Sequence, residues 1–190
     1  MKLWTILLFC SVTLFAAEHY YAVEDLDVRE DGVILEVKTQ KLANGIGRFY
    51  YESGTIKSET PFKDGLREGL GKIYFESGKL KAETPFKNDK IEGLKKEYYE
   101  SGVVQSEVTF VNDEAEGIAK FYYPSHKLQG ETPFKKNKAD GITKLYSPAG
   151  QLVRTIEFKE GKIVKGFDYN DKGNKVELKP EDLSEGEGQE

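Results

Sequence analysis

A repeat of 24 residues runs through most of this chain and constrains its fold more than any other feature. Its copies begin at Gly45, Gly69, Gly93, Gly117 and Gly141. When each glycine is counted as repeat position 0, position 3 is always basic, position 5 tyrosine, position 11 aliphatic and position 17 phenylalanine. Five columns that hold in five copies indicate a stacked repeat architecture, in which each unit packs mainly against its two neighbours.

Two turn signals divide each copy into strands. The first is Ser-Gly in three copies, replaced by Ser125-His126 and Ala149-Gly150 in the last two. Gly, Asn and Asp tolerate the positive φ that two-residue hairpin turns require. The runs between the turns are roughly ten residues long and rich in Tyr, Phe, Ile, Val and Thr, which is typical of strands. The second signal lies at Asp64-Gly65, Asn88-Asp89, Asn112-Asp113, Lys136-Asn137 and Glu160-Gly161.

A two-residue Ser-Gly turn sets a register that the side chains support. It places position 6 opposite position 11, an aromatic residue on an aliphatic one, as in Tyr51 and Ile56. A slip by one residue would destroy this pattern. The sequence therefore predicts an all-β repeat protein, a long antiparallel β-meander of hairpins with two-residue turns. The register also places position 3 opposite position 14, which pairs opposite charges in Arg48–Glu59, Lys72–Glu83, Lys96–Glu107 and Lys120–Glu131 but sets Lys144 against Thr155.

Alternation of side chains along the strands separates two faces of the predicted sheet. Position 17 lies on a mainly apolar face, and its phenylalanines are expected to be buried: Phe62, Phe86, Phe110, Phe134 and Phe158. The other face carries the basic residues of position 3, those of position 12 (Lys57, Lys81, Gln105 and Gln129) and the tyrosines of position 5: Tyr50, Tyr74, Tyr98, Tyr122 and Tyr146. Two interpretations of this tyrosine column stay open. It packs neighbouring repeats together, or it forms a ladder that binds a partner, since tyrosine is enriched in recognition surfaces.

Less regular segments flank the array and are expected to cap it. Residues 30–35 resemble residues 52–57 of the first copy, and a drifted sixth copy begins at Gly166. The expected organisation is a capping segment over 18–44, five repeats over 45–165, a degenerate capping repeat over 166–179 and an acidic tail over 180–190.

The first 17 residues have the order of a secretory signal peptide. Lys2 precedes an apolar run of about 13 residues, shorter than the roughly 20 of a spanning helix, and Ala16-Ala17 follow it. We therefore expect cleavage near these alanines and a secreted or periplasmic protein, with an uncleaved anchor as the alternative. Cys10 does not indicate a lipoprotein, because Phe9 precedes it and apolar residues continue after it.

The residues required for common catalytic and metal sites are missing from the predicted mature chain. His19 and His126 are the only histidines, and Cys10 is the only cysteine. His126 stands in place of a turn glycine, and the position-14 glutamates are expected to pair with basic residues rather than to act as acid–base groups. The acidic turns at 88–89 and 112–114 lack the ligand density of a calcium loop. The sequence predicts no enzyme, no cofactor and no metal.

The balance of acidic and basic residues limits the kinds of partner that this chain is expected to bind. Residues 18–179 carry 27 basic and 28 acidic side chains, and the tail adds five carboxylates without a base. This balance argues against nucleic-acid binding and offers no net basic surface for a membrane. A protein or a glycan is the expected partner.

The copy that begins at Gly69 resembles the MORN repeat variant, which occurs in bacterial proteins labelled YwqK-type antitoxins. The resemblance rests on Gly69, Lys72, Tyr74, Gly78 and Leu80-Lys81, followed by Glu83, and it extends over roughly residues 30–178. It implies stacked β-hairpins with a binding or scaffolding role. An exported, non-enzymatic binding protein is thus the first hypothesis, and an antitoxin or immunity-like protein that neutralises a toxin is the alternative.

Overall fold

The computed structural model describes residues 19–30 and 33–179. The expected signal segment 1–17, the acidic tail 180–190 and two residues of the short copy at 30–35 lie outside these ranges. The described residues contain no α-helix, and their single 3-10 turn, η1, spans Val23–Asp25. The all-β repeat fold is confirmed.

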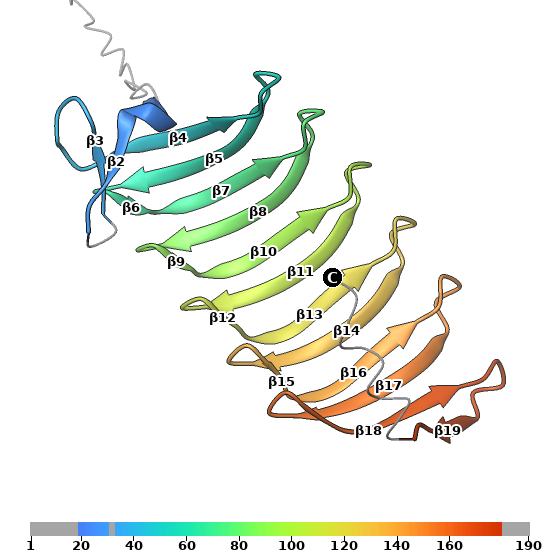
Figure 1. Cartoon of the computed structure of the whole chain (residues 1–190). Helices are drawn as coiled ribbons and strands as arrows, with labels where there is room; N and C mark the ends of the chain where they lie inside the picture. The colour runs from blue at the N-terminus through green and yellow to red at the C-terminus, as the bar shows by residue number, and fades with distance from the viewer. Residues whose placement is uncertain (1–18, 31–32, 180–190) are drawn as a thin grey trace, which may run out of the picture.

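Each repeat contributes a six-residue strand from position 0 and an eight-residue strand from position 11, and each of the first four also contributes a two-residue strand after the second turn. The six-residue strands are β4 (Gly45–Tyr50), β7 (Gly69–Tyr74), β10 (Gly93–Tyr98), β13 (Gly117–Tyr122) and β16 (Gly141–Tyr146). The eight-residue strands are β5 (Ile56–Lys63), β8 (Leu80–Lys87), β11 (Val104–Val111), β14 (Leu128–Lys135) and β17 (Leu152–Lys159). The two-residue strands are β6 (Leu66–Arg67), β9 (Lys90–Ile91), β12 (Glu114–Ala115) and β15 (Lys138–Ala139). Successive hairpins pair antiparallel in chain order and bow into one curved layer (Figure 1).

The two ends of the sheet depart from this pattern. At the first end, β1 (Tyr20–Ala22) pairs parallel with β4, so the sheet is mixed rather than purely antiparallel as expected. The strands β2 (Leu26–Val28) and β3 (Ile34–Glu36) form a separate two-stranded sheet. At the other end, β18 (Lys162–Tyr169) continues the meander and β19 (Lys175–Glu177) closes it. Short strands at both ends limit the exposed sheet edge that another chain can pair with.

The two turn signals produce two kinds of hairpin connection. The second signal forms the expected two-residue turn, since Lys63 pairs with Leu66 and both Asp64 and Gly65 have positive φ. The Ser-Gly signal instead closes a three-residue loop. The N–H of Tyr51 donates to the carbonyl of Thr55, and Gly54 adopts a φ of 83°. This is a turn completed by a glycine bulge.

The longer loop shifts the register beside it. Position 3 still faces position 14 in all five repeats, as predicted. Beyond that pair, Tyr50 rather than Tyr51 faces Ile56, and Lys57 is the extra residue of a bulge. The predicted pairing of position 6 with position 11 is therefore wrong. A bulge reorients the side chains next to it, and the ammonium of Lys57 lies 5.6 Å from the centre of the Tyr51 ring.

The repeats form a single layer of sheet, and this limits how much side-chain surface the fold can bury. No large side chain among the described residues is fully buried, the most buried residues are Ala43 and Ala119, and Tyr21 in the cap is the one large residue that is nearly buried. All five phenylalanines of position 17 are only partly buried, so their predicted burial is wrong. An apolar face needs a second layer to exclude water completely, and the five repeats form one layer. Phe86, for example, packs over Gly71 and under the guanidinium of Arg67.

Candidate functional site

The predicted site residues come together on one face of the sheet. Position 3 of each repeat lies beside position 14 of its own repeat and of the preceding one, so Glu59 has Arg48 on one side and Lys72 on the other. Basic and acidic side chains therefore alternate across the strands. We call this surface the Tyr–Glu face; it carries Arg48, Lys72, Lys96, Lys120 and Lys144, the position-14 glutamates Glu59, Glu83, Glu107 and Glu131, and the position-5 tyrosines.

Ion pairs form at part of this charge row. Arg48 and Glu59 approach to 2.7 Å, and Lys96 and Glu107 to 3.2 Å, both within a hairpin as predicted. Glu131 instead pairs at 2.9 Å with Lys144 of the following repeat. Lys72 and Lys120 make no ion pair with the described residues. Because these side chains are partly exposed, each pair contributes only about 0–1 kcal/mol to stability.

The position-5 tyrosines join each repeat to the one before it. The Tyr74 hydroxyl donates to Oε2 of Glu59 at 2.7 Å, Tyr98 to Glu83 at 2.8 Å and Tyr122 to Glu107 at 2.9 Å, and Tyr146 makes a longer contact of 3.4 Å with Glu131. Tyr50 opens the array, has no preceding repeat to supply a glutamate and is 51% exposed. The packing interpretation of the column is thus visible in the structure, and a binding role is a separate question.

These contacts change the acidity of both partners. Burial, followed by the hydrogen bond to Glu59, raises the pKa of Tyr74 to about 12. Burial and the bond to Glu83 do the same for Tyr98, whose pKa is also raised to about 12. Burial acts to raise the pKa of the Glu59 carboxyl, but hydrogen bonds from Tyr74 and Arg48 outweigh it, and the pKa is lowered. At neutral pH the tyrosines are therefore donors and Glu59 is an acceptor.

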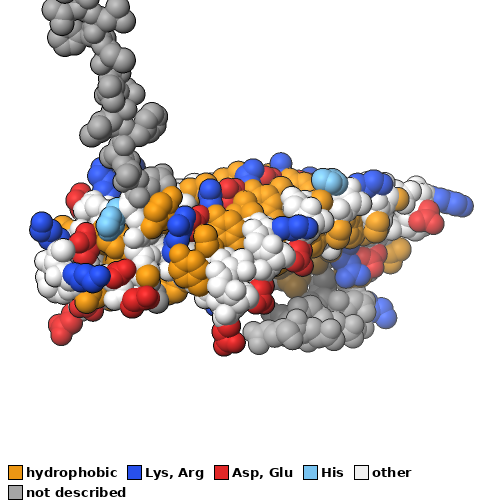
Figure 2. Space-filling view, turned by 90° about the horizontal axis from the view of Figure 1, so that it is seen from above, with side chains coloured by type: hydrophobic (Ala, Val, Ile, Leu, Met, Phe, Trp, Pro, Cys, Tyr) orange, Lys and Arg blue, Asp and Glu red, His pale blue; other side chains and the backbone are white. Residues whose placement is uncertain are grey.

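An apolar stripe that was not predicted from the sequence lies on the same face. Position 1 faces position 16 across each hairpin, and Leu70 lies opposite Pro85. The position-1 side chains of the later repeats are exposed by 42–55%: Leu70, Leu94, Ile118 and Ile142. Figure 2 shows hydrophobic side chains along the length of the molecule, with charged ones among them. The recurrence of an aliphatic residue directly after the position-0 glycine was the signal that could have revealed this stripe.

The opposite face has its own hydrogen bonds between repeats, and it carries a hollow. The hydroxyls of Tyr51, Tyr99 and Tyr123 donate to the backbone carbonyl of the position-5 tyrosine in the next repeat at 2.7–2.8 Å. The position-12 lysines belong to this face, contrary to prediction, because the bulge turns them. The hollow between the second and third repeats is lined by Ile73, Phe75, Lys81, Lys95, Glu97 and Tyr99.

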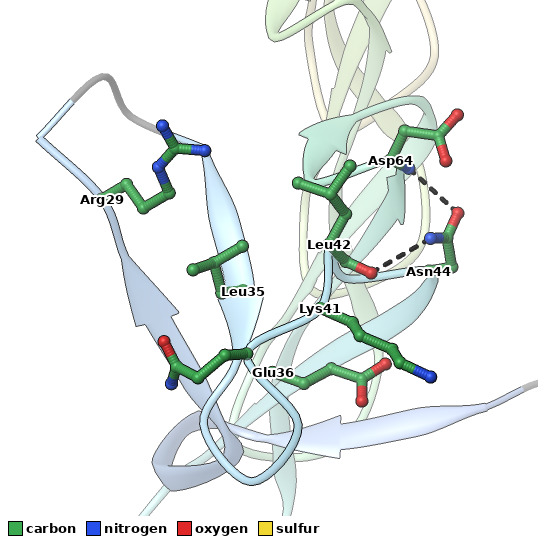
Figure 3. Close-up of a pocket in the computed structure, with 8 residues that line it drawn as sticks. Arg29, Leu35, Glu36, Lys41, Leu42, Asn44 and Asp64 are labelled. Atoms are coloured by element: carbon green, nitrogen blue, oxygen red, sulfur yellow. Dashed lines mark hydrogen bonds between the residues drawn. The ribbon is translucent and has the colours of Figure 1, made fainter.

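A second hollow lies where the cap meets the first repeat (Figure 3). The side chain of Asn44 lies at one side of it: Oδ1 accepts the N–H of Asp64 at 2.9 Å, and Nδ2 donates to the carbonyl of Leu42 at 3.1 Å. The carboxylate of Glu36 accepts the hydroxyls of Tyr21 and Thr39. The bond between Asn44 and Asp64 joins the cap to the first repeat, and the others lie within the cap, so we interpret the hollow as a junction.

The histidine and the acidic turn residues that the sequence singled out contribute to the loops and turns. His126 adopts a φ of 65° in the place of a loop glycine, as predicted. Asp89 and Asp113 accept the backbone N–H groups of Arg67 and Ile91 in the preceding repeat, at 2.8 and 2.6 Å. Within 19–30 and 33–179, no three potential ligands from His, Cys, Asp and Glu gather at one point, and no helix is long and apolar enough to cross a membrane.

The comparison with protein families identifies the repeat. The family described as MORN repeat variant matches residues 43–64, 67–88, 91–112, 115–136 and 139–160. The five matches cover more than half of the chain and follow the five hairpins of the sheet. No curated protein matches the chain significantly.

Proposed function

The chain belongs to the MORN repeat variant family, and from this premise we propose that it is a non-enzymatic binding or scaffolding module that holds another macromolecule on its Tyr–Glu face. MORN repeats are generally protein- or membrane-binding modules. We infer a protein or glycan partner for this chain, because its repeat region has no net basic charge to attract a membrane.

The observation that supports this proposal most strongly is the exposed aliphatic stripe beside the charge row. Leu70 and Leu94 are 44% and 42% exposed, although the repeat places an aliphatic residue at this position every time. Aliphatic side chains that stay in water at the same position of successive repeats are characteristic of an interaction surface. The hydrogen bonds between repeats hold the row in a fixed arrangement, which lowers the entropy lost when a partner binds.

The export of the protein is part of the proposal and rests on residues 1–17. Cleavage near Ala16 or Ala17 would release a secreted or periplasmic chain without a cysteine. The alternative, an antitoxin or immunity-like protein, involves the same kind of binding with a toxin as the partner. Cell fractionation separates the two: a cytoplasmic protein that retains residues 1–17 would contradict export and favour the alternative.

The face is tested by comparing two double variants of the full chain as baits. Leu70→Ser with Leu94→Ser alters the Tyr–Glu face. Ile73→Ser with Phe121→Ser alters the opposite face, where these side chains are similarly exposed, by 43% and 38%. Thermal melts first establish that both variants fold. We expect the first variant to lose a partner that the parent and the second variant both capture. The reverse pattern would move the binding surface to the other face.

A further inference from the structure

Two lysine pairs lie in adjacent repeats at one edge of the Tyr–Glu face, whereas the second repeat carries such a pair by itself. Lys135 lies directly opposite Lys138, and Lys159 directly opposite Lys162, in the two-residue turns of the fourth and fifth repeats. All four side chains are exposed. Like charges directly opposite each other in a sheet are destabilising, so folding of this chain does not account for them.

The two turns lie next to each other. The N–H of Gly161 donates to the carbonyl of Ala139 at 2.8 Å, and a Cβ at Gly161 would lie 3.8 Å from Cβ of Lys138. Along β14 and β17, every second side chain lies on the same face of the sheet. Lys135 and Lys159 are at position 18, two residues after position 16 and four after position 14, so they lie on the Tyr–Glu face with those positions. Adjacent turns are two strands apart, and the lysines therefore recur about every 9.6 Å along the edge.

Acidic residues nearby leave a positive excess. Segments 135–140 and 157–165 contain six lysines and three carboxylates. Asp140 pairs with Lys159 at 3.4 Å, and Glu157 with Lys165 at 3.1 Å. Lys135, Lys138 and Lys162 form no ion pair with a residue in the described part of the chain. The exposed side chain of Ile142 lies on the same face, one strand pair from this cluster.

We propose that this lysine cluster, formed by Lys135, Lys138, Lys159 and Lys162, binds an extended acidic polypeptide segment of a partner protein. A chain in the extended polyproline II conformation has three residues per turn and rises about 3.1 Å per residue, so carboxylates at every third residue lie on one side and recur about every 9.3 Å, close to the spacing of the turns. The inference rests on the proposed function, because it assigns partner chemistry to one edge of the same face.

The neighbouring repeat favours a narrow ligand over an anionic membrane. Segment 111–116 at the adjacent turn of the third repeat carries Asp113, Glu114 and Glu116 and no basic residue. A flat anionic surface laid along this edge would meet those carboxylates together with the lysines. A single extended chain contacts the lysines and avoids them.

The test uses the full chain and a labelled synthetic peptide that has glutamate at every third residue among glycine and serine. A peptide with glutamine in place of glutamate is the control ligand, and fluorescence anisotropy is measured at low and at physiological salt. We expect the glutamate peptide alone to bind, with an affinity that falls as salt rises. Lys135→Gln with Lys138→Gln should weaken binding by about tenfold or more.

Lys87→Gln with Lys90→Gln is the matched control, because Lys87 and Lys90 form the same like-charge pair in the second repeat, where Asp89 and Glu92 offset them. It should change the affinity by less than about twofold. Equal effects of the two double variants, or no binding of the peptide to any form of the chain, would overturn the proposal.

Two further measurements distinguish an acidic partner segment from the other ligands that the lysine cluster could bind. If the peptide binds only after the five carboxylates of 180–190 are changed to amides, the cluster belongs to the chain's own tail and not to a partner. If anionic vesicles bind through Lys135 and Lys138 and the peptide does not, the ligand is a membrane. The serine variants of Leu70 and Leu94 test the proposed function separately. If those variants still capture the macromolecular partner, the choice of face is refuted. If the acidic peptide still binds in that case, the lysine cluster remains its binding site.

Discussion

The hydroxyl of Tyr74 donates a 2.7 Å hydrogen bond to Oε2 of Glu59, which belongs to the preceding repeat. The same carboxylate accepts two hydrogen bonds from Arg48, at 2.7 and 2.9 Å. One glutamate thus connects two hairpins, and the relationship recurs along the sheet. It explains why tyrosine, and not phenylalanine, occupies position 5 in the second to the fifth repeat.

Loss of this hydroxyl should weaken the joint between repeats. Tyr98→Phe keeps the ring and removes the donor to Glu83, so we expect a loss of about 1–2 kcal/mol of unfolding free energy, as for a hydrogen bond to a charged group that is partly solvated. Tyr50→Phe is the matched control, because Tyr50 has no preceding repeat, and it should cost less than about 0.5 kcal/mol. Urea melts give both values, and equal losses would contradict the role assigned to the hydroxyl.

The raised tyrosine pKa values predict a loss of stability at alkaline pH. Tyr74 and Tyr98 titrate near 12 in the folded chain, whereas an unfolded tyrosine titrates at about 10. A pKa that is higher in the folded state gives stability that is complete below the unfolded value and is lost as the pH rises through the folded one. Unfolding free energy should therefore fall between about pH 10 and pH 12. Tyr98→Phe should show a shallower fall, and an unchanged slope would argue against the shift.

The partial burial of the phenylalanine column sets a moderate cost for its removal. Phe110 is neither buried nor exposed, so Phe110→Ala should cost about 1.5–2.5 kcal/mol, roughly half of what a fully buried phenylalanine costs. Val111→Ala, next to it and 43% exposed, should cost less than about 1 kcal/mol. A loss above about 3 kcal/mol for Phe110→Ala would indicate that a further layer covers this face.

The position-0 glycines should differ in their tolerance of alanine. Gly93 has a φ of 119°, and a Cβ there would lie 3.2 Å from Cγ of Pro85. Gly117 has a φ of 78°, with nothing within 4 Å of its Cβ position, because Thr109 replaces the proline of the preceding repeat. We expect Gly117→Ala to cost about 1–2 kcal/mol through left-handed strain, and Gly93→Ala to cost clearly more. Similar thermal shifts for the two variants would exclude a role for the proline contact.

The repeat register shows what could be predicted for the candidate site. The charges of positions 3 and 14 face each other as expected, because opposite charges at a constant spacing survive only in one register. The placement of Lys57 and Lys81 was wrong, since the Ser-Gly loop has one residue more than a two-residue turn. Loop length depends on the backbone conformation of Glu52 and Ser53, and both loop lengths are compatible with the same Ser-Gly signal.

The sequence by itself determined the period, the strands, the second set of turns and the side of the sheet on which the tyrosines lie. These features depend on contacts within one hairpin or between adjacent hairpins, and the repeated columns record such contacts. Only the tertiary structure decided that Phe110 stays half-buried, that Leu94 lies in water and that Lys135 and Lys138 face the same side as the tyrosines. Burial depends on whether a second layer covers the sheet, and a periodic pattern of apolar residues is the same with and without that layer.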